Sequence, residues 1–179
     1  LTKCNFKGLT TLNLSENDLE YKDIECLSKC DFRRLTNLNL SDNCIDDDKF
    51  KLILEGVLKS NIKNLNLSVN EITDDGIIYF TKTLENSCKN KKDFNEFNDE
   101  ISLSSELKSI PKLKSIDFSL NSITDEGAQS LFEYLSFSSF DTLLTELKLN
   151  GNSITSESSE IISSAIIFNE VIERLELAA

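Results

Sequence analysis

The stretch LTTLNLSEN at Leu9–Asn17 returns almost unchanged as LTNLNLSDN at Leu35–Asn43, 26 residues further along the chain. Its pattern is L-x-x-L-x-L-x-x-N, with another apolar residue two positions after the Asn. With Ile or Phe allowed for Leu, the pattern recurs at Ile62–Ile72, Leu113–Ile123 and Leu144–Ile154, and it begins once more at Ile172–Leu177. Self-similarity at such a period is the signature of a fold that stacks one small unit many times.

Each unit predicts a short strand followed by a helix. The alternating residues Leu12 and Leu14 predict a strand with one buried face, and Asn13 points to the other face. We expect the recurring Asn to hydrogen-bond backbone groups of the turn and of the next repeat, which water cannot reach. Apolar residues seven, ten and fourteen positions after it lie on one helix face, although Ser159 fits poorly: Phe50, Ile53, Val57; Ile77, Phe80, Leu84; Ala128, Leu131, Leu135; Ser159, Ile162, Ile166.

Two of the predicted helices begin with the same sequence pattern. Thr73 and Thr124 are good N-cap residues, and acidic residues follow them, which suits the positive end of a helix dipole. Gly76 and Gly127 recur in the first turn, where Gly lowers helix stability. Their return at the same offset predicts close packing against the strand.

These copies resemble the leucine-rich repeat family, and the N-x-I-T-D-[DE]-G helix start is similar to its ribonuclease-inhibitor-like subclass. The resemblance implies an α/β solenoid, a right-handed superhelix with a curved parallel sheet on the concave face and helices on the convex face. We expect residues 1–179 to form a single leucine-rich repeat domain that is incomplete at both ends. It would contain about five full repeats and a partial sixth.

Residues 86–109 interrupt the period. Successive Asn residues of the repeat are 26, 27, 51 and 31 positions apart, and the long interval contains this Asn-, Lys- and Ser-rich segment. We expect a low-complexity insertion between a helix ending near Leu84 and a strand near Leu113. Within it, Phe94, Phe97 and Ile101 have helical spacing, so they would either pack on neighbouring coils or form an exposed docking motif.

Composition narrows the possible functions. The chain carries 19 Lys plus Arg against 31 Asp plus Glu, a net charge of −12, and contains no His. The charge argues against nucleic-acid or membrane partners, and the missing His removes imidazole catalysis and imidazole metal ligands. There is no glycine motif for nucleotide phosphates and no apolar run long enough for a transmembrane helix. We therefore expect no enzymatic activity, cofactor, metal or small-molecule substrate.

Two groups of residues resemble metal sites only weakly. Asp42, Asp46 and Asp48 lack the Gly and Glu of a calcium loop, so a solvated helix start is the better interpretation. Cys26 and Cys30 would be four apart on one helix, but no second ligand pair accompanies them. The odd number of five cysteines, without a C-x-x-C motif, indicates reduced thiols and a cytoplasmic protein, with a cytoskeletal or ciliary setting as the narrower expectation.

The concave face is the predicted partner-binding surface. The position between the two strand leucines, and an apolar pair just beyond the strands, supply the candidate residues: Asn13, Asn39, Asn66, Val69, Asp117, Leu120 and Lys148. We expect Val69 and Leu120 to be neighbours although they are 51 residues apart in sequence.

The family resemblance implies a non-catalytic protein–protein interaction module, or a scaffold or assembly subunit, which presents its concave surface to a protein partner. An alternative is a Ran-type GTPase-activating protein domain, because that class is built from the same repeat subclass. A single-turnover GTP hydrolysis assay with Ran would separate the two, since only the alternative predicts acceleration.

Overall fold

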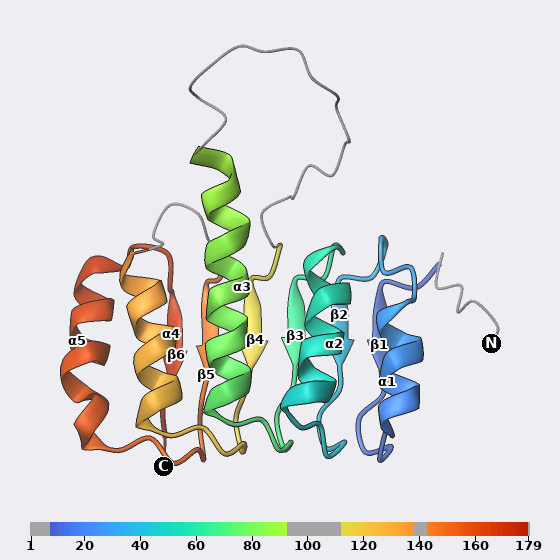
Figure 1. The fold of residues 1–179 in the computed structure, drawn as a ribbon, viewed down its shortest axis with the longest axis horizontal. Coiled ribbons are helices and arrows are strands. Elements are labelled where there is room, and N and C mark those ends of the chain that lie inside the picture. The colour runs from blue at the N-terminus through green and yellow to red at the C-terminus, as the bar shows by residue number, and fades with distance from the viewer. Residues whose placement is uncertain (1–7, 93–111, 138–142, 179) are drawn as a thin grey trace, which may run out of the picture.

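The computed structural model describes residues 8–92, 112–137 and 143–178, with strands and helices in regular alternation (Figure 1). Six three-residue strands form the sheet: β1 Thr11–Asn13, β2 Asn37–Asn39, β3 Asn64–Asn66, β4 Ser115–Asp117, β5 Glu146–Lys148 and β6 Arg174–Glu176. Between them lie α1 Tyr21–Ser28, α2 Asp47–Leu58, α3 Asp74–Lys92, α4 Asp125–Phe137, the short 3-10 helix η2 Ser156–Ser158 and α5 Ser159–Phe168. We call each strand with the helix that follows it a coil, and we count β6 as the sixth coil although no helix follows it among the described residues.

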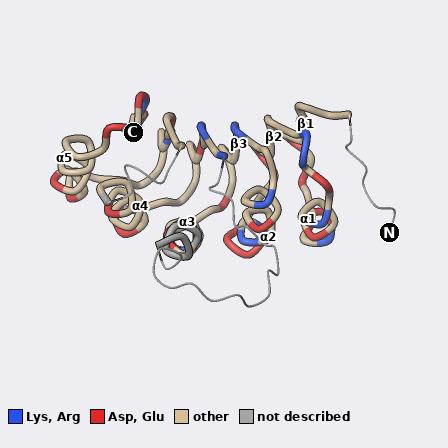
Figure 2. The backbone as a smooth tube through the Cα atoms, turned by 90° about the horizontal axis from the view of Figure 1, so that it is seen from above, with Lys and Arg blue, Asp and Glu red and all other residues tan. Residues whose placement is uncertain are grey.

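All strands are parallel and are ordered β1 to β6 along one sheet. The repeat sets the register, because equivalent residues such as Leu12, Leu38 and Leu65 pair directly. Helices lie along the outer arc and strands along the shorter inner arc (Figure 2). Helices pack about 8–10 Å apart and strands about 4.8 Å apart, so stacked coils must curve. This confirms the leucine-rich repeat solenoid predicted from the sequence.

The core lies between sheet and helices. The predicted inward faces of α2, α3 and α4 are all buried, and Phe50, Phe80 and Phe118 form an aromatic cluster with ring centroids 5.6 to 6.2 Å apart. In α5 the prediction is confirmed for Ile162, which packs against the core, but it is wrong for Ile166. Ile166 is 59% exposed, and its neighbour Ala165 is buried instead.

Two further elements differ from expectation. Helix α3 continues to Lys92 rather than ending near Leu84, so the start of the predicted insertion is helical. Helix α1 ends at Ser28, and therefore Cys30 lies just after the helix instead of on it. The predicted docking residues Phe94, Phe97 and Ile101 lie outside the described residues.

The recurring Asn residues bond their own turn, as predicted, but the other coil that each one bonds is the preceding coil rather than the next. The Oδ1 of Asn70 accepts hydrogen bonds from the backbone N–H groups of Asn43 and Ile45 at 3.1 and 2.9 Å. Its Nδ2 donates to the carbonyls of Leu40 and Leu67 at 3.1 and 2.9 Å. Asn43, Asn121 and Asn152 repeat this pattern, so one amide satisfies the turns of two coils at once.

A second set of bonds, not predicted, joins the helix starts. Asp74 accepts from the backbone N–H and the hydroxyl of Thr124, at 2.8 and 2.6 Å, and from the backbone N–H of Gly127 at 3.0 Å. Asp47 bonds Thr73 in the same way.

These aspartates also explain the recurring glycines. A Cβ built on Gly127 would lie 2.4 Å from the Asp74 Oδ1, and one on Gly76 would lie 2.3 Å from the Asp47 Oδ1. The glycines therefore make room for a carboxylate of the preceding coil, and the expected packing against the strand is wrong. In the fifth coil the equivalent residue is Ser158, whose hydroxyl donates to Asp125.

Candidate interaction surface

Two rows of side chains from the strands form the floor of the concave face. The row between the buried strand residues was predicted as Asn13, Asn39, Asn66, Asp117 and Lys148, and Glu176 continues it on β6. The other row, at the first residue of each strand, was missed although the same two-residue period implies it: Thr11, Asn37, Asn64, Ser115, Glu146 and Arg174. Residues of both rows line a shallow hollow of about 240 Å³.

Most of the predicted floor residues also brace their own strand ends. The Oδ1 of Asn13, Asn39, Asn66 and Asp117 each accepts a hydrogen bond of 2.9 to 3.0 Å from the backbone N–H of the serine two residues later. A backbone N–H can only donate, so the oxygen of each amide must face it. The NH₂ group of Asn13, Asn39 and Asn66 is consequently turned away from that bond, and among the described residues it makes no hydrogen bond.

The two halves of the floor differ in charge. In coils one to three every floor residue is neutral, and Asn64 donates to Asn37, which in turn donates to Thr11. In coils five and six Arg174 contacts Glu146 and Glu176 at 3.3 and 2.6 Å, and Lys148 contacts Glu146 at 3.5 Å. A hydrogen bond from Asn150, with the nearby cations, lowers the pKa of Glu176. These charges are therefore paired with one another.

Val69 and Leu120 lie just beyond the strand ends on consecutive coils. The backbone N–H of Val69 donates to the carbonyl of Ser119 at 2.9 Å, which places the two apolar residues side by side. Their exposures are 42% and 56%. Both have left-handed backbone, with φ of 57° and 56°, a conformation that is costly for a β-branched residue such as Val. We call these two residues the apolar pair.

The two ends of the strands define two edges of the solenoid. At the strand-exit edge, the lower edge in Figure 1, strands end and helices begin. At the strand-entry edge, the upper edge, helices end and strands begin. The Asn and Asp bonds and the apolar pair all belong to the strand-exit edge.

The described ranges hold no group of three or more His, Cys, Asp or Glu placed to bind a metal ion. Asp46, from the weak calcium-loop pattern, caps α2 by accepting from the backbone N–H of Lys49 at 2.9 Å. No helix in the described part of the chain is both long and apolar enough to cross a bilayer.

Comparisons with known proteins agree with this architecture. A family model described as a leucine-rich repeat matches residues 9–28, 34–48, 59–80 and 109–132. Among curated proteins nothing matches. Leiomodin-1 actin-binding site 2 superposes with a TM-score of 0.54 at 12% identity, over 96% of this chain and 72% of that one. A tropomodulin C-terminal domain from Caenorhabditis elegans gives 0.58 at 12% identity, over 89% and 83%. The repeats, the solenoid and the matching family model together show that this chain belongs to the leucine-rich repeat family.

Proposed function

We propose that this chain is a protein-interaction module, a scaffold or assembly subunit, that receives a protein partner on its concave face. The apolar pair is the observation that carries the proposal. Val69 and Leu120 are exposed beside a polar floor, and burying both would contribute about 2–4 kcal/mol at about 25 cal/mol per Å². The other candidate residues, Asn13, Asn39, Asn66, Asp117 and Lys148, would surround this contact as its polar part.

A cytoskeletal setting is the narrower form of the proposal. The likeness to leiomodin-1 actin-binding site 2 supports the fold, and the name of that site makes actin the first partner to test. Two measurements test actin as the partner. One is co-sedimentation of the purified chain with actin filaments, and the other is its binding to monomeric actin. A negative result would leave the interaction module itself standing.

The module is tested by chemical cross-linking in native cell extract with quantitative mass spectrometry. We expect a Val69→Lys, Leu120→Lys double variant to remain folded and to lose the partner that the unmodified chain captures. The matched control is Ile166→Lys, Ile167→Lys, which changes two exposed apolar residues on α5. Retention of the partner by both variants would contradict the proposal, and its release by deletion of residues 94–101 would move the docking site to the insertion.

A further inference from the structure

Four exposed cations gather at the strand-entry edge of coils two to four: Arg34, Lys63, Lys112 and Lys114. The backbone N–H of Lys114 donates to the carbonyl of Lys63 at 2.7 Å, so the two lysines extend from adjacent positions about 4.8 Å apart. In a chain with a net charge of −12, this is a local reversal of sign. We call these four residues the basic edge.

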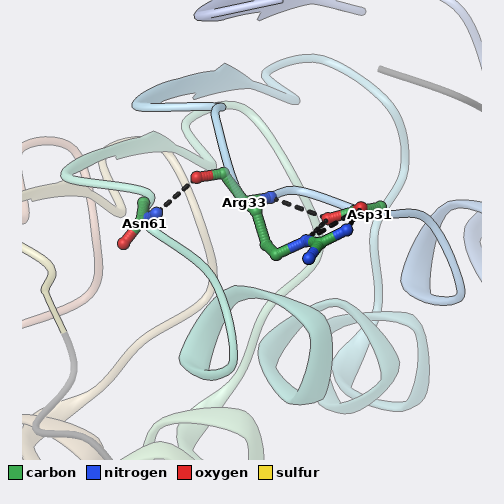
Figure 3. A network of polar contacts seen from close by, with 3 residues as sticks. All are labelled: Asp31, Arg33 and Asn61. Carbon is green, nitrogen blue, oxygen red and sulfur yellow. Dashed lines mark hydrogen bonds and ion pairs between the residues drawn. The ribbon is translucent and has the colours of Figure 1, made fainter. Parts of the chain in front are cut away.

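In the described part of the chain, neighbouring residues give the basic edge no counter-charge. Arg33 is neutralised by Asp31: its Nε donates to Oδ1 at 2.9 Å and its Nη2 donates to Oδ2 at 2.6 Å (Figure 3). Asn61 donates to the carbonyl of Arg33 and accepts from the Nζ of Lys112, which is a neutral partner for a cation. Within the described ranges none of the four cations makes an ion pair. Like charges on adjacent strands repel, so the stack gains nothing from Lys63 and Lys114 as neighbours.

The floor next to the basic edge offers hydrogen-bond donors. Asn39 and Asn66 keep their oxygens on the backbone of Ser41 and Ser68, which leaves their NH₂ groups for an incoming acceptor. Val69 follows Asn66 on coil three, and Leu120 takes the same place on coil four, where the floor residue is Asp117. Lys63 and Val69 are six residues apart, as are Lys114 and Leu120, a span of about 20 Å of extended chain.

We propose that coils three and four bind an extended acidic protein segment, with its carboxylates on the basic edge and an apolar anchor about six residues away on the apolar pair. The inference rests on the proposed function and names the chemistry of the partner. Carboxylates accept from both Lys and amide groups, and a short acidic segment needs only a few cations. A nucleic acid is disfavoured because a chain of this net charge repels a long polyanion.

The test is fluorescence anisotropy with the unmodified 179-residue chain and a labelled synthetic peptide. The probe carries three Glu, a five-residue Ser-Gly spacer and a Leu-Phe pair. One matched peptide replaces Glu by Gln, and another replaces Leu-Phe by Ser-Ser. We expect each matched peptide to bind about tenfold more weakly than the probe, and the probe itself to weaken as salt rises.

Variants of the chain locate the site. Lys63→Glu, Lys114→Glu should weaken probe binding by about tenfold or more, whereas Lys22→Glu, Lys82→Glu makes the same charge change on the helices and should leave binding within about twofold. If both double variants lose the same affinity for the probe, net charge rather than a local site determines binding, and the proposal is wrong. Tighter binding of a single-stranded oligonucleotide than of the probe would overturn the choice of an acidic protein segment.

Peptide binding and capture of the native partner separate the acidic-segment proposal from the proposed function. If no peptide binds while the native partner is still lost in the Val69→Lys, Leu120→Lys variant, the acidic chemistry is wrong and the module stands. If the probe binds and depends on Lys63 and Lys114 while no cellular partner needs the apolar pair, the binding site stands and the proposed concave contact is wrong.

Discussion

The strand-exit and strand-entry edges of this solenoid use their polar side chains in opposite ways. At the strand-exit edge Asn70 and Asp74 are bonded to backbone of a neighbouring coil. At the strand-entry edge Lys63 and Lys114 stand exposed, with no ion pair within the described residues. The polar side chains at the strand-exit edge therefore hold neighbouring coils together, whereas the lysine side chains at the strand-entry edge are available to bind a partner.

The largest effect should come from breaking the Asn bonds at the strand-exit edge. Asn70→Ala removes the acceptor for two backbone N–H groups and a donor to two coils, so we expect the free energy of unfolding to fall by about 3 kcal/mol. Asn66→Ala is the matched control, since Asn66 accepts a single bond from Ser68, and should cost less than about 1 kcal/mol. Urea unfolding followed by circular dichroism measures both, and equal losses would mean that the two strand faces are assigned wrongly.

The contact between Gly127 and Asp74 should give the next largest effect. Gly127→Ala places a Cβ against the Asp74 carboxylate, and we expect a loss of about 2 kcal/mol from overpacking. In an Asp74→Ala background the contact with the carboxylate oxygen is absent, while Ile123 Cγ2 and the Cα of residue 74 remain 3.0 and 3.2 Å from the added Cβ. The same change should therefore still cost free energy, but clearly less than in the unmodified chain. A double-mutant cycle by thermal unfolding measures the coupling, and additive losses would show that the carboxylate is not the obstacle.

A smaller effect is expected for the contact of Asp125 with Thr155 and Ser158, at the helix start of the fifth coil. The stability that this contact provides should depend on pH. Hydrogen bonds from Ser158 and Thr155 lower the pKa of Asp125 below its ordinary value of 3.8. A depressed folded pKa gives stability that is fully present well above 3.8 and is lost as pH falls through the folded value. The melting-temperature advantage of the unmodified chain over Asp125→Asn should therefore be constant at neutral pH and shrink below about pH 4. An advantage that grows on acidification would refute this contact.

The smallest effect is expected at the strand-entry edge. Lys63→Glu, Lys114→Glu removes no side-chain hydrogen bond or ion pair between described residues, so the unfolding free energy should change by less than about 0.5 kcal/mol. Because this variant is also expected to lose the acidic probe, it separates binding from stability. Cooperative destabilisation in the same urea experiment would place the lysines in the scaffold instead.

Much of the fold follows from the repeat itself. The alternation around Leu12 and the offsets of Phe50 and Phe80 predict strands and inward helix faces, because each position recurs in several coils. Ile166 was wrongly predicted to be buried. The pattern in the fifth coil begins with the polar residue Ser159, so the apolar periodicity there does not identify the buried helix face. The inward positions of the fifth coil were assigned from the offsets of the other coils rather than from its own residues.

The candidate surface was less predictable, for physical reasons. The period of two separates Asn66 from the core, but it cannot show that its oxygen bonds the backbone of Ser68. The left-handed backbone at Val69 was also not predictable, since Val rarely adopts that conformation. The contact of Asp74 with Gly127 joins residues 53 positions apart, beyond any local pattern. The basic edge could have been found by aligning Lys63 with Lys114 in the repeat.

Amide hydrogen exchange, measured on the free chain and on the chain bound to the acidic probe peptide, tests the division between the two edges most directly. The amides of Ile45, Ile72 and Ile123 donate to Asn side chains at the strand-exit edge, so they should exchange slowly and should not change on binding. Added protection should fall on residues 34–39, 61–66 and 112–117, and on Val69 and Leu120, where the apolar anchor of the probe is expected to bind. Protection that instead appears on the helices, with the strand-entry edge unchanged, would contradict the account.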